Sequence, residues 1–285
     1  MKESQFKTSG QTRTERDLLG EKEVPTEALF GIQTLRCIEN FDISRQLLSH
    51  YPPFVKALGL VKMGAVKANN ELKLINDEIT NAIVEACQEL MDGKHTEHFP
   101  IDLVQGGAGT SVNMNANEVI ANRALEILGK DRGEYKYCHP NDHVNMAQST
   151  NDAYPTAMHL GLYMLHDELK ASLEKLIESF EKKSIEFKEM VKMGRTQLQD
   201  AVPMTLGQSF GAYMDAMKNE LKRIDAASKE FLTINMGATA IGTGITAEPG
   251  YAELCTQYIN DISGWDIVLA ENLVEATNDT SAMVG

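Results

Sequence analysis

Three polar segments interrupt a sequence that otherwise has mainly helical patterns, and they hold most of the side chains that could bind a small ligand. They span residues 105–115, 139–152 and 194–203. Long helices need no such segments for packing, whereas loops rich in hydroxyls, amides and glycines are where binding groups tend to lie. We therefore expect ligand chemistry in these three segments.

The first segment contains the glycine-rich stretch 106–111, which leads directly into a helical pattern. Glycines let backbone N–H groups approach a ligand closely, and the start of a helix favours an anion. Thr110 and Ser111 add hydroxyl donors. The stretch lacks the Gly-Lys-Ser/Thr ending of a P-loop and a complete G-x-G-x-x-G motif, so it suits a carboxylate better than a nucleotide. A plain glycine-rich connector is the alternative interpretation.

The second segment ends in four neighbouring side chains, at positions 149–152, that can all form hydrogen bonds. One of them is expected to cap a helix that starts near Pro155, because serine, threonine, asparagine and aspartate are the preferred capping residues. Capping explains one residue and leaves the others available for a ligand.

Two groups of histidines raise the question of a metal site. His139 and His143 stand four residues apart, but Pro140 disfavours a helix that would place them on one face, and the sequence offers no third ligand beside them. Residues 95–98 hold two histidines and a glutamate, for which a solvated loop is the favoured interpretation. We predict no metal site.

The third segment contains glycine and proline, which predict a reversal of the chain between two helices. Arg195 could offset a substrate carboxylate or simply pair with Asp200, and the sequence leaves both possibilities open. Residues 207–211 match the G-x-S-x-G pattern of serine hydrolases. That motif requires a strand before it, and here it lies within a helical repeat, so we reject the hydrolase interpretation.

The elements that must position these segments are mostly helices. Apolar residues recur at helical spacing over residues 53–68, 75–90 and 119–128. Two longer patterns, over 162–191 and 206–231, predict helices of about 45 Å, a length that suits a bundle. Residues 1–50 show only short strand-like or irregular pieces. The sequence therefore predicts a mostly α fold with a long-helix bundle.

Composition limits the classes of function. At about 100–200 residues per domain, 285 residues predict two domains. The net charge of −14 argues against nucleic acid as a partner, and no apolar stretch reaches the length of a membrane helix. The first 20 residues lack the apolar core of a secretory signal, and the four cysteines are scattered. We expect a cytoplasmic protein with reduced thiols.

The three polar blocks resemble conserved blocks of the aspartase/fumarase superfamily. The resemblance rests on residues 106–118 (GGAGTSVNMNANE), 139–156 (HPNDHVNMAQSTNDAYPT) and 194–208 (GRTQLQDAVPMTLGQ), in that order. It implies a small N-terminal lyase domain at 1–143 and part of a long-helix central domain at 144–285, with the C-terminal domain absent. It also implies a homotetramer whose active sites are shared between subunits.

Within the superfamily the chain looks most like its aspartate ammonia-lyase branch. The resemblance implies reversible deamination of L-aspartate to fumarate and ammonia through an aci-carboxylate intermediate, without a cofactor, although a divalent cation could stimulate it. Thr110, Ser149 and Thr150 would bind the β-carboxylate, and Thr196 would contact the α-carboxylate. Such donors suit the doubly charged carboxylate that forms when a proton leaves Cβ.

Two further matched positions concern the amino group. Asn151 would hold the ammonium side of the substrate, and Gln197 would lie beside the leaving group. Fumarases carry a histidine at the position of Gln197, since expelling hydroxide requires a proton donor. Ammonia leaves without further protonation, so glutamine favours aspartate over malate. A fumarate hydratase-type lyase and a non-catalytic assembly fragment are the alternatives.

Three features complicate the match. His139, Asn141 and Asp142 match a secondary anion-binding loop of fumarases. Met146 stands where the family commonly has a lysine, which removes a positive charge close to the site. The superfamily's flexible loop (Gly-Ser-Ser-x-Met-Pro-x-Lys-x-Asn-Pro), which supplies the serine base, does not occur within the 285 residues. We therefore expect no catalytic base in this chain, and no activity from it alone.

Overall fold

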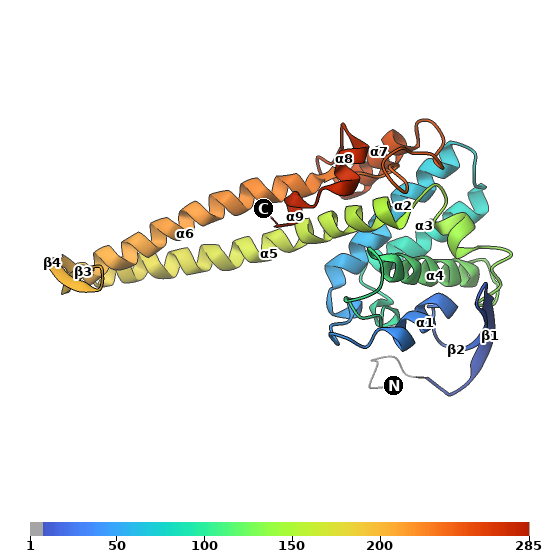
Figure 1. Ribbon diagram of the computed structural model, residues 1–285, viewed down its shortest axis with the longest axis horizontal. Coiled ribbons are helices and arrows are strands. Elements are labelled where there is room, and N and C mark those ends of the chain that lie inside the picture. The colour runs from blue at the N-terminus through green and yellow to red at the C-terminus, as the bar shows by residue number, and fades with distance from the viewer. Residues whose placement is uncertain (1–7, 285) are drawn as a thin grey trace. The chain divides into compact units, whose positions relative to one another are not determined.

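Helices make up most of the computed structural model, as the sequence predicts, and the model describes residues 8–284 (Figure 1). The chain forms two units. The first contains the residues up to 162 together with 231–284, and the second contains 163–230. These units do not divide at the expected domain boundary between residues 143 and 144, which remains a proposal. Positions 1–7 and 285 of the expected domains lie outside the described residues.

The core of the first unit is built on α2 (Pro52–Glu71), which packs against α3 (Asp77–Met91) and α7 (Tyr251–Ser263). The helix α4 (Thr110–Ile127) packs in turn against α3. The middle of α2, residues 57–66, is buried on every side, which explains why this stretch is apolar apart from Lys62. Lys62 is itself completely buried. The predicted helical patterns in this region are confirmed.

The N-terminal part forms the antiparallel hairpin β1 (Thr12–Asp17) and β2 (Gly20–Pro25), followed by α1 (Ile32–Asn40). The strand-like pieces expected here are confirmed, whereas α1 was not predicted. A buried carboxylate from α4, that of Glu118, accepts hydrogen bonds from backbone N–H groups at the start of α1. A carboxylate at this position satisfies N–H groups that the helix itself leaves unpaired.

Short elements complete the first unit. The two-residue strands β5 (Thr233–Ile234) and β6 (Val268–Leu269) pair in parallel. The remaining short helices are η1 (Leu48–His50), η2 (Thr96–His98), the π-helical turn η3 (Pro140–Val144), α8 (Leu273–Asn278) and α9 (Ser281–Val284).

The longest helix, α5 (Thr150–Glu186), starts in the first unit and continues into the second. It begins earlier than predicted, so Pro155 lies inside it and not at its start. Proline has no N–H to donate to the carbonyl of Asn151, four residues before it. The side-chain amide of Asn235 donates to that carbonyl instead, at 3.0 Å. This tertiary hydrogen bond explains why the helix tolerates the proline.

In the second unit, α5 is followed by the hairpin β3 (Val191–Thr196) and β4 (Gln199–Thr205) and by α6 (Leu206–Ser228), and the short η4 (Lys229–Leu232) bridges the two units. Aromatic rings of α5 and α6 pack on one another, among them Phe180 and Phe210, with ring centroids 6.1 Å apart.

Residues 207–211, which match the G-x-S-x-G pattern, lie inside α6. This confirms the prediction that the match falls within a helix and is not the strand-to-helix turn of a hydrolase. A Cβ atom at Gly207 would come within 2.5 Å of the carbonyl oxygen of Ser184 on α5. The glycine therefore serves close packing of the two helices.

Two further expectations concern the whole described part of the chain. All four cysteines are buried and none forms a disulfide. Among the described residues, no helix is both long enough and apolar enough to cross a membrane.

Candidate active site

The first polar block forms the entry to α4. Gly109 precedes the helix with φ +93°, a left-handed conformation that favours glycine. The ring of Tyr154 lies so close to Gly109 that a Cβ atom there would collide with it. Thr110, the first helical residue, is exposed. The glycine is thus required by both backbone conformation and packing, and it places the Thr110 hydroxyl at a helix N-terminus, where an anion is favoured.

The second polar block forms the start of α5. The Ser149 hydroxyl accepts a hydrogen bond from the N–H of Asn151 at 3.2 Å, as an N-cap does. The buried carboxylate of Asp152 accepts from the N–H of Ser149 and from the N–H of Thr239, both at 2.9 Å. Capping thus involves Ser149 and Asp152, and the hydroxyl hydrogen of Ser149 remains a donor that could serve a ligand.

The first two blocks adjoin. Asn113, one turn into α4, donates from its side-chain amide to the hydroxyl of Thr150 at 3.3 Å. Tyr154 on α5 contacts Gly109 at the entry to α4. Two helix N-termini with hydroxyl side chains therefore lie next to each other. The partial positive charge of both helix N-termini and the nearby hydroxyl donors would favour a bound carboxylate.

Asn151 is held by the segment between α6 and α7. Its side-chain amide donates to the carbonyl of Ala240 at 2.8 Å. With the NH₂ group directed to that carbonyl, the side-chain oxygen of Asn151 is the atom that can accept a hydrogen bond from an ammonium group. The expected role of Asn151 on the amino side of a substrate is chemically consistent with this orientation.

Lys62 is the residue near this site that the sequence analysis missed. Its ammonium donates to the side-chain oxygens of Asn113 at 2.7 Å, Gln148 at 2.8 Å and Asn145 at 2.9 Å. The available signal was a single lysine within the apolar stretch 57–66 of α2. Burial lowers the pKa of Lys62 to about 7, and the negative charge of Asp152 opposes this shift.

The three residues expected to bind a secondary anion lie at the start of the second block. His139 is the N-cap of η3, and its Nδ1 accepts from the N–H groups of Asn141 and Asp142 at 3.1 and 3.2 Å. His139 and Asn141 line a cavity of about 770 Å³, together with Ser111 and Arg16. Asp142 is exposed and is not among the residues lining this cavity. The structure therefore gathers two of the three predicted residues around one cavity, with two arginines, Arg16 and Arg36, that sequence reasoning missed.

The third block forms the β3–β4 hairpin of the second unit. Thr196 pairs with Gln199, and the turn between them has φ +49° at Gln197 and +65° at Leu198. Positive φ at both central residues defines a type I′-like turn, for which Asn-Gly is the usual sequence. The side chains at the tip, including Thr196 and Gln197, are exposed.

The structure resolves one alternative in the third block. Arg195 pairs with Asp200 across the hairpin, with Nε and Oδ1 3.1 Å apart. This confirms the structural pairing that the sequence offered as one possibility. Both side chains are about two-thirds exposed, so their interaction contributes little to stability.

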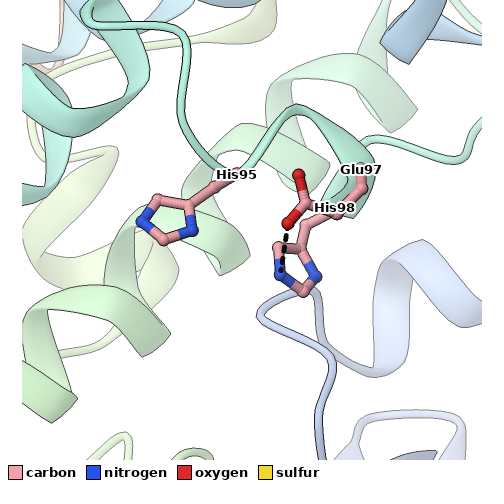
Figure 2. A group of neighbouring side chains, drawn as sticks. All are labelled: His95, Glu97 and His98. Carbon is pink, nitrogen blue, oxygen red and sulfur yellow. Dashed lines mark ion pairs between the residues drawn. The ribbon is translucent and has the colours of Figure 1, made fainter. Parts of the chain in front are cut away.

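Figure 2 shows the group His95, Glu97 and His98, whose potential ligand atoms all lie within 4.8 Å of one another. The expectation of a solvated loop is wrong for His98, which is only 7% exposed. Its Nδ1 accepts the N–H of Leu29 at 3.3 Å, which places the ring proton on Nε2, the nitrogen facing Glu97. If Nε2 bound a metal, the ring proton would move to Nδ1, and Nδ1 could no longer accept the hydrogen bond from Leu29. The hydrogen bond to Leu29 therefore argues that His98 has a structural role.

A family model described as "Lyase" matches residues 20–285. The chain therefore belongs to this lyase family.

Within it, the chain is 55% identical over 273 residues to aspartate ammonia-lyase of Pseudomonas canavaninivorans, and 50% identical over 277 residues to aspartate ammonia-lyase of Escherichia coli strain K12. These alignments cover 95% and 97% of this chain and 58% of each relative. The chain thus spans somewhat more than half the length of these relatives.

Solved structures agree with the fold. A fumarate lyase:delta crystallin of Brucella melitensis bound to cobalt has a TM-score of 0.93 at 50% identity, covering 96% of this chain and 59% of that one. A class II fumarase of Schistosoma mansoni has a TM-score of 0.87 at 33% identity, covering 96% and 60%. The predicted superfamily resemblance and mostly α fold are confirmed.

Proposed function

We propose that this chain contributes substrate-binding groups to an ammonia-lyase that converts L-aspartate reversibly to fumarate and ammonia. The observation that carries the proposal is the adjacency of two helix N-termini that bear Thr110, Ser149 and Thr150. Its support from sequence is the identity of 50–55% to proteins named aspartate ammonia-lyase.

The chemistry requires donors that are already in place when charge develops. Removal of a proton from Cβ delocalises a second negative charge into the β-carboxylate. Hydroxyls and N–H groups that are fixed beforehand stabilise this charge without reorganisation, and loss of one such donor typically costs about 10²–10³ in rate. Asn113 and Asp152 hold the Thr150 and Ser149 region in this way. We therefore expect the largest loss of rate when the Ser149 or Thr150 hydroxyl is removed.

Thr196 and Gln197 complete the proposed site on the α-carboxylate and amino side. Gln197 carries no titratable proton, which suits a substrate whose leaving group departs as neutral ammonia. Since both side chains are exposed at the hairpin tip, we propose that they act in a site shared between subunits of a homotetramer. Light scattering of the 285-residue chain tests this proposal. We expect a tetramer, and a stable monomer would contradict it.

Four finer assignments accompany this function. We propose a secondary anion site around His139 and Asn141, with Asp142 at its edge. We propose a cytoplasmic location, a domain boundary between residues 143 and 144, and the absence of activity in this chain alone, since its sequence contains no copy of the superfamily's serine loop.

The decisive experiment uses the 285-residue chain and a chimera. In the chimera, the chain replaces the matching 58% of E. coli aspartate ammonia-lyase. Fumarate is followed by ultraviolet absorbance, with L-aspartate and L-malate as alternative substrates. We expect no fumarate from the chain alone and fumarate from L-aspartate with the chimera. Thr150→Ala should lower the chimera's kcat/KM by about 10²-fold or more.

Other outcomes distinguish the alternatives. A chimera that uses L-malate and not L-aspartate would favour a fumarate hydratase-type lyase. A folded tetrameric chimera without turnover on either substrate would favour a non-catalytic assembly fragment. Fumarate from the chain alone would overturn the claim that it lacks a base.

A further inference from the structure

Side chains accept all three hydrogen bonds that the ammonium of Lys62 can donate. It is completely buried, and its three N–H donors match three amide oxygens at 2.7–2.9 Å, those of Asn113, Asn145 and Gln148. A buried charge is costly unless all of its hydrogen bonds are made, and an apolar residue in the same space would often be more stable. The benefit of this lysine must therefore be sought in the three groups that it holds.

Two of those groups flank the turn that leads to Ser149. Asn145 and Gln148 stand on either side of Met146 and Ala147, and Ala147 has a left-handed φ of +60°. That conformation is uncommon for alanine and persists only where surrounding contacts fix it. The ammonium draws the side-chain oxygens from both sides of this turn to a single point. Lys62 thus links the two ends of the turn through hydrogen bonds to Asn145 and Gln148.

The third group connects Lys62 to the hydroxyl of the site. Asn113 accepts from the ammonium through its oxygen and donates through its NH₂ group to the hydroxyl of Thr150 at 3.3 Å. The same NH₂ group also donates to Asn145 at 3.0 Å. An acceptor engaged by a cation makes the amide a stronger donor, since linked hydrogen bonds polarise one another. Lys62 therefore reaches Thr150 through a single side chain.

Charge acts in the same direction. The groups facing Lys62 are the carboxylate of Asp152 on α5 and the thiols of Cys87 on α3 and Cys255 on α7. Burial raises the pKa of both thiols, so they are neutral at physiological pH. The charge of Asp152 therefore favours the protonated form of Lys62 against the effect of burial.

We propose that Lys62 is a positioning residue, whose ammonium fixes the turn at residues 145–148 and orients the Ser149 and Thr150 donors toward a bound carboxylate. The first part of this proposal, that Lys62 orders the turn, does not depend on the proposed function. Only the orientation toward a carboxylate rests on the proposed function.

The test compares Lys62→Met with Val61→Ala in the 285-residue chain. Val61 is equally buried in the same helix, but its side chain forms no hydrogen bonds, so its truncation is a control for lost packing. Hydrogen exchange of amides, resolved by peptide, reports order locally. We expect exchange over residues 145–151 to rise about tenfold or more in Lys62→Met, with little change in β1–β2 and no selective rise in Val61→Ala.

A second variant covers a failure to fold. Lys62→Gln keeps side-chain donors without the charge and should give a smaller rise over residues 145–151. If residues 145–151 exchange as in the unchanged chain in either folded variant, the proposal is wrong. If both Lys62 variants unfold completely while Val61→Ala folds, Lys62 is a residue of core stability and the positioning role is also wrong.

The chimera separates this proposal from the function it serves. If the unchanged chimera is active, Lys62→Met should lower kcat by about 10-fold or more with a smaller change in KM, since the donors act chiefly on the transition state. An equal loss in Val61→Ala, or a change in KM alone, would contradict the orientation role. If the unchanged chimera is inactive, the proposed function fails, and hydrogen exchange still decides the role of Lys62.

Discussion

The polar blocks of the first unit and the hairpin of the second unit hold their side chains in opposite ways. Around Thr150, each group has partners from several elements, and the central cation, Lys62, is completely buried. Around Gln197, side chains are exposed, and the cross-strand ion pair of Arg195 is largely solvated. Preorganisation is therefore built into the first unit, whereas the hairpin relies on backbone conformation to present its residues.

This difference teaches where sequence changes should matter. In the first unit, a single atom added or removed disturbs a network of buried groups, and the cost is large. In the hairpin, the same change alters groups that water already solvates, and the cost is small. The following experiments challenge that contrast, from the largest expected effect to the smallest.

Gly109→Ala should cost the most. The substitution places a Cβ atom against the ring of Tyr154 and forces alanine into φ +93°. We expect a loss of about 3 kcal/mol, measured by urea unfolding, from about 1 kcal/mol for the left-handed backbone and about 2 kcal/mol for overpacking. Gly129→Ala is the matched control, because Gly129 has φ +68° and nothing within 4 Å of its Cβ position. Equal losses in the two variants would show that the ring contact is unimportant.

His98 should make the stability of the first unit depend on pH. Burial lowers its pKa from 6.5 to about 4. As pH falls below 6.5, the unfolded chain binds a proton before the folded chain does, so stability is lost. We expect His98 to account for a loss of about 1.5 kcal/mol between pH 6.5 and pH 5.

The measurement for His98 is the difference between the unchanged chain and His98→Gln in urea unfolding at several pH values. Glutamine can accept the Leu29 N–H but does not titrate. The difference removes contributions from other buried groups, such as Asp152, whose pKa is raised to about 6 by burial. Parallel pH curves for the two proteins would show that His98 is not the responsible group.

Leu198→Gly should stabilise the hairpin modestly. Leu198 is 93% exposed and has φ +65°, so glycine relieves backbone strain without loss of packing. We expect slower amide exchange in β3 and β4, equivalent to about 0.5–1 kcal/mol after the entropy cost of glycine. Leu198→Ala removes the same side chain but keeps the strain, and should not slow exchange. A similar effect of both substitutions would assign the gain to the side chain.

Arg195→Ala should have the smallest effect. The ion pair with Asp200 is exposed, and such pairs contribute about 0–1 kcal/mol. We expect a change in unfolding free energy below about 0.5 kcal/mol, indistinguishable from that of Asp200→Ala. A loss above 2 kcal/mol would mean that the hairpin is held by its side chains, and the contrast between the two regions would fail.

Sequence patterns predicted the helices well where one physical signal dominated. Apolar residues recur at helical spacing over residues 53–68 and 75–90, which form α2 and α3. The start of α5 was placed too late because Pro155 normally marks a helix start, and only the tertiary hydrogen bond from Asn235 allows it inside the helix. The hairpin was predicted only as a reversal, since its residues lack the alternation of a half-buried strand.

The candidate site was predicted unevenly for a related reason. Thr110, Ser149 and Thr150 stood out because polar residues cluster in short segments. Lys62 and Arg16 did not, because each is a single residue far away in the chain whose importance depends on tertiary contacts. His98 was misjudged because its burial depends on tertiary contacts, such as that with Leu29, which local composition does not reveal.

The burial of every thiol gives this protein a practical property. Cys87, Cys138 and Cys255 are fully buried and Cys37 nearly so, and burial raises the pKa of all four, that of Cys138 to about 12. Alkylating reagents attack the thiolate, so the folded chain should be nearly inert to maleimides at neutral pH. Leu198→Cys would then provide one reactive handle at the hairpin tip, where a fluorescent dye could report on subunit association without removing any native cysteine.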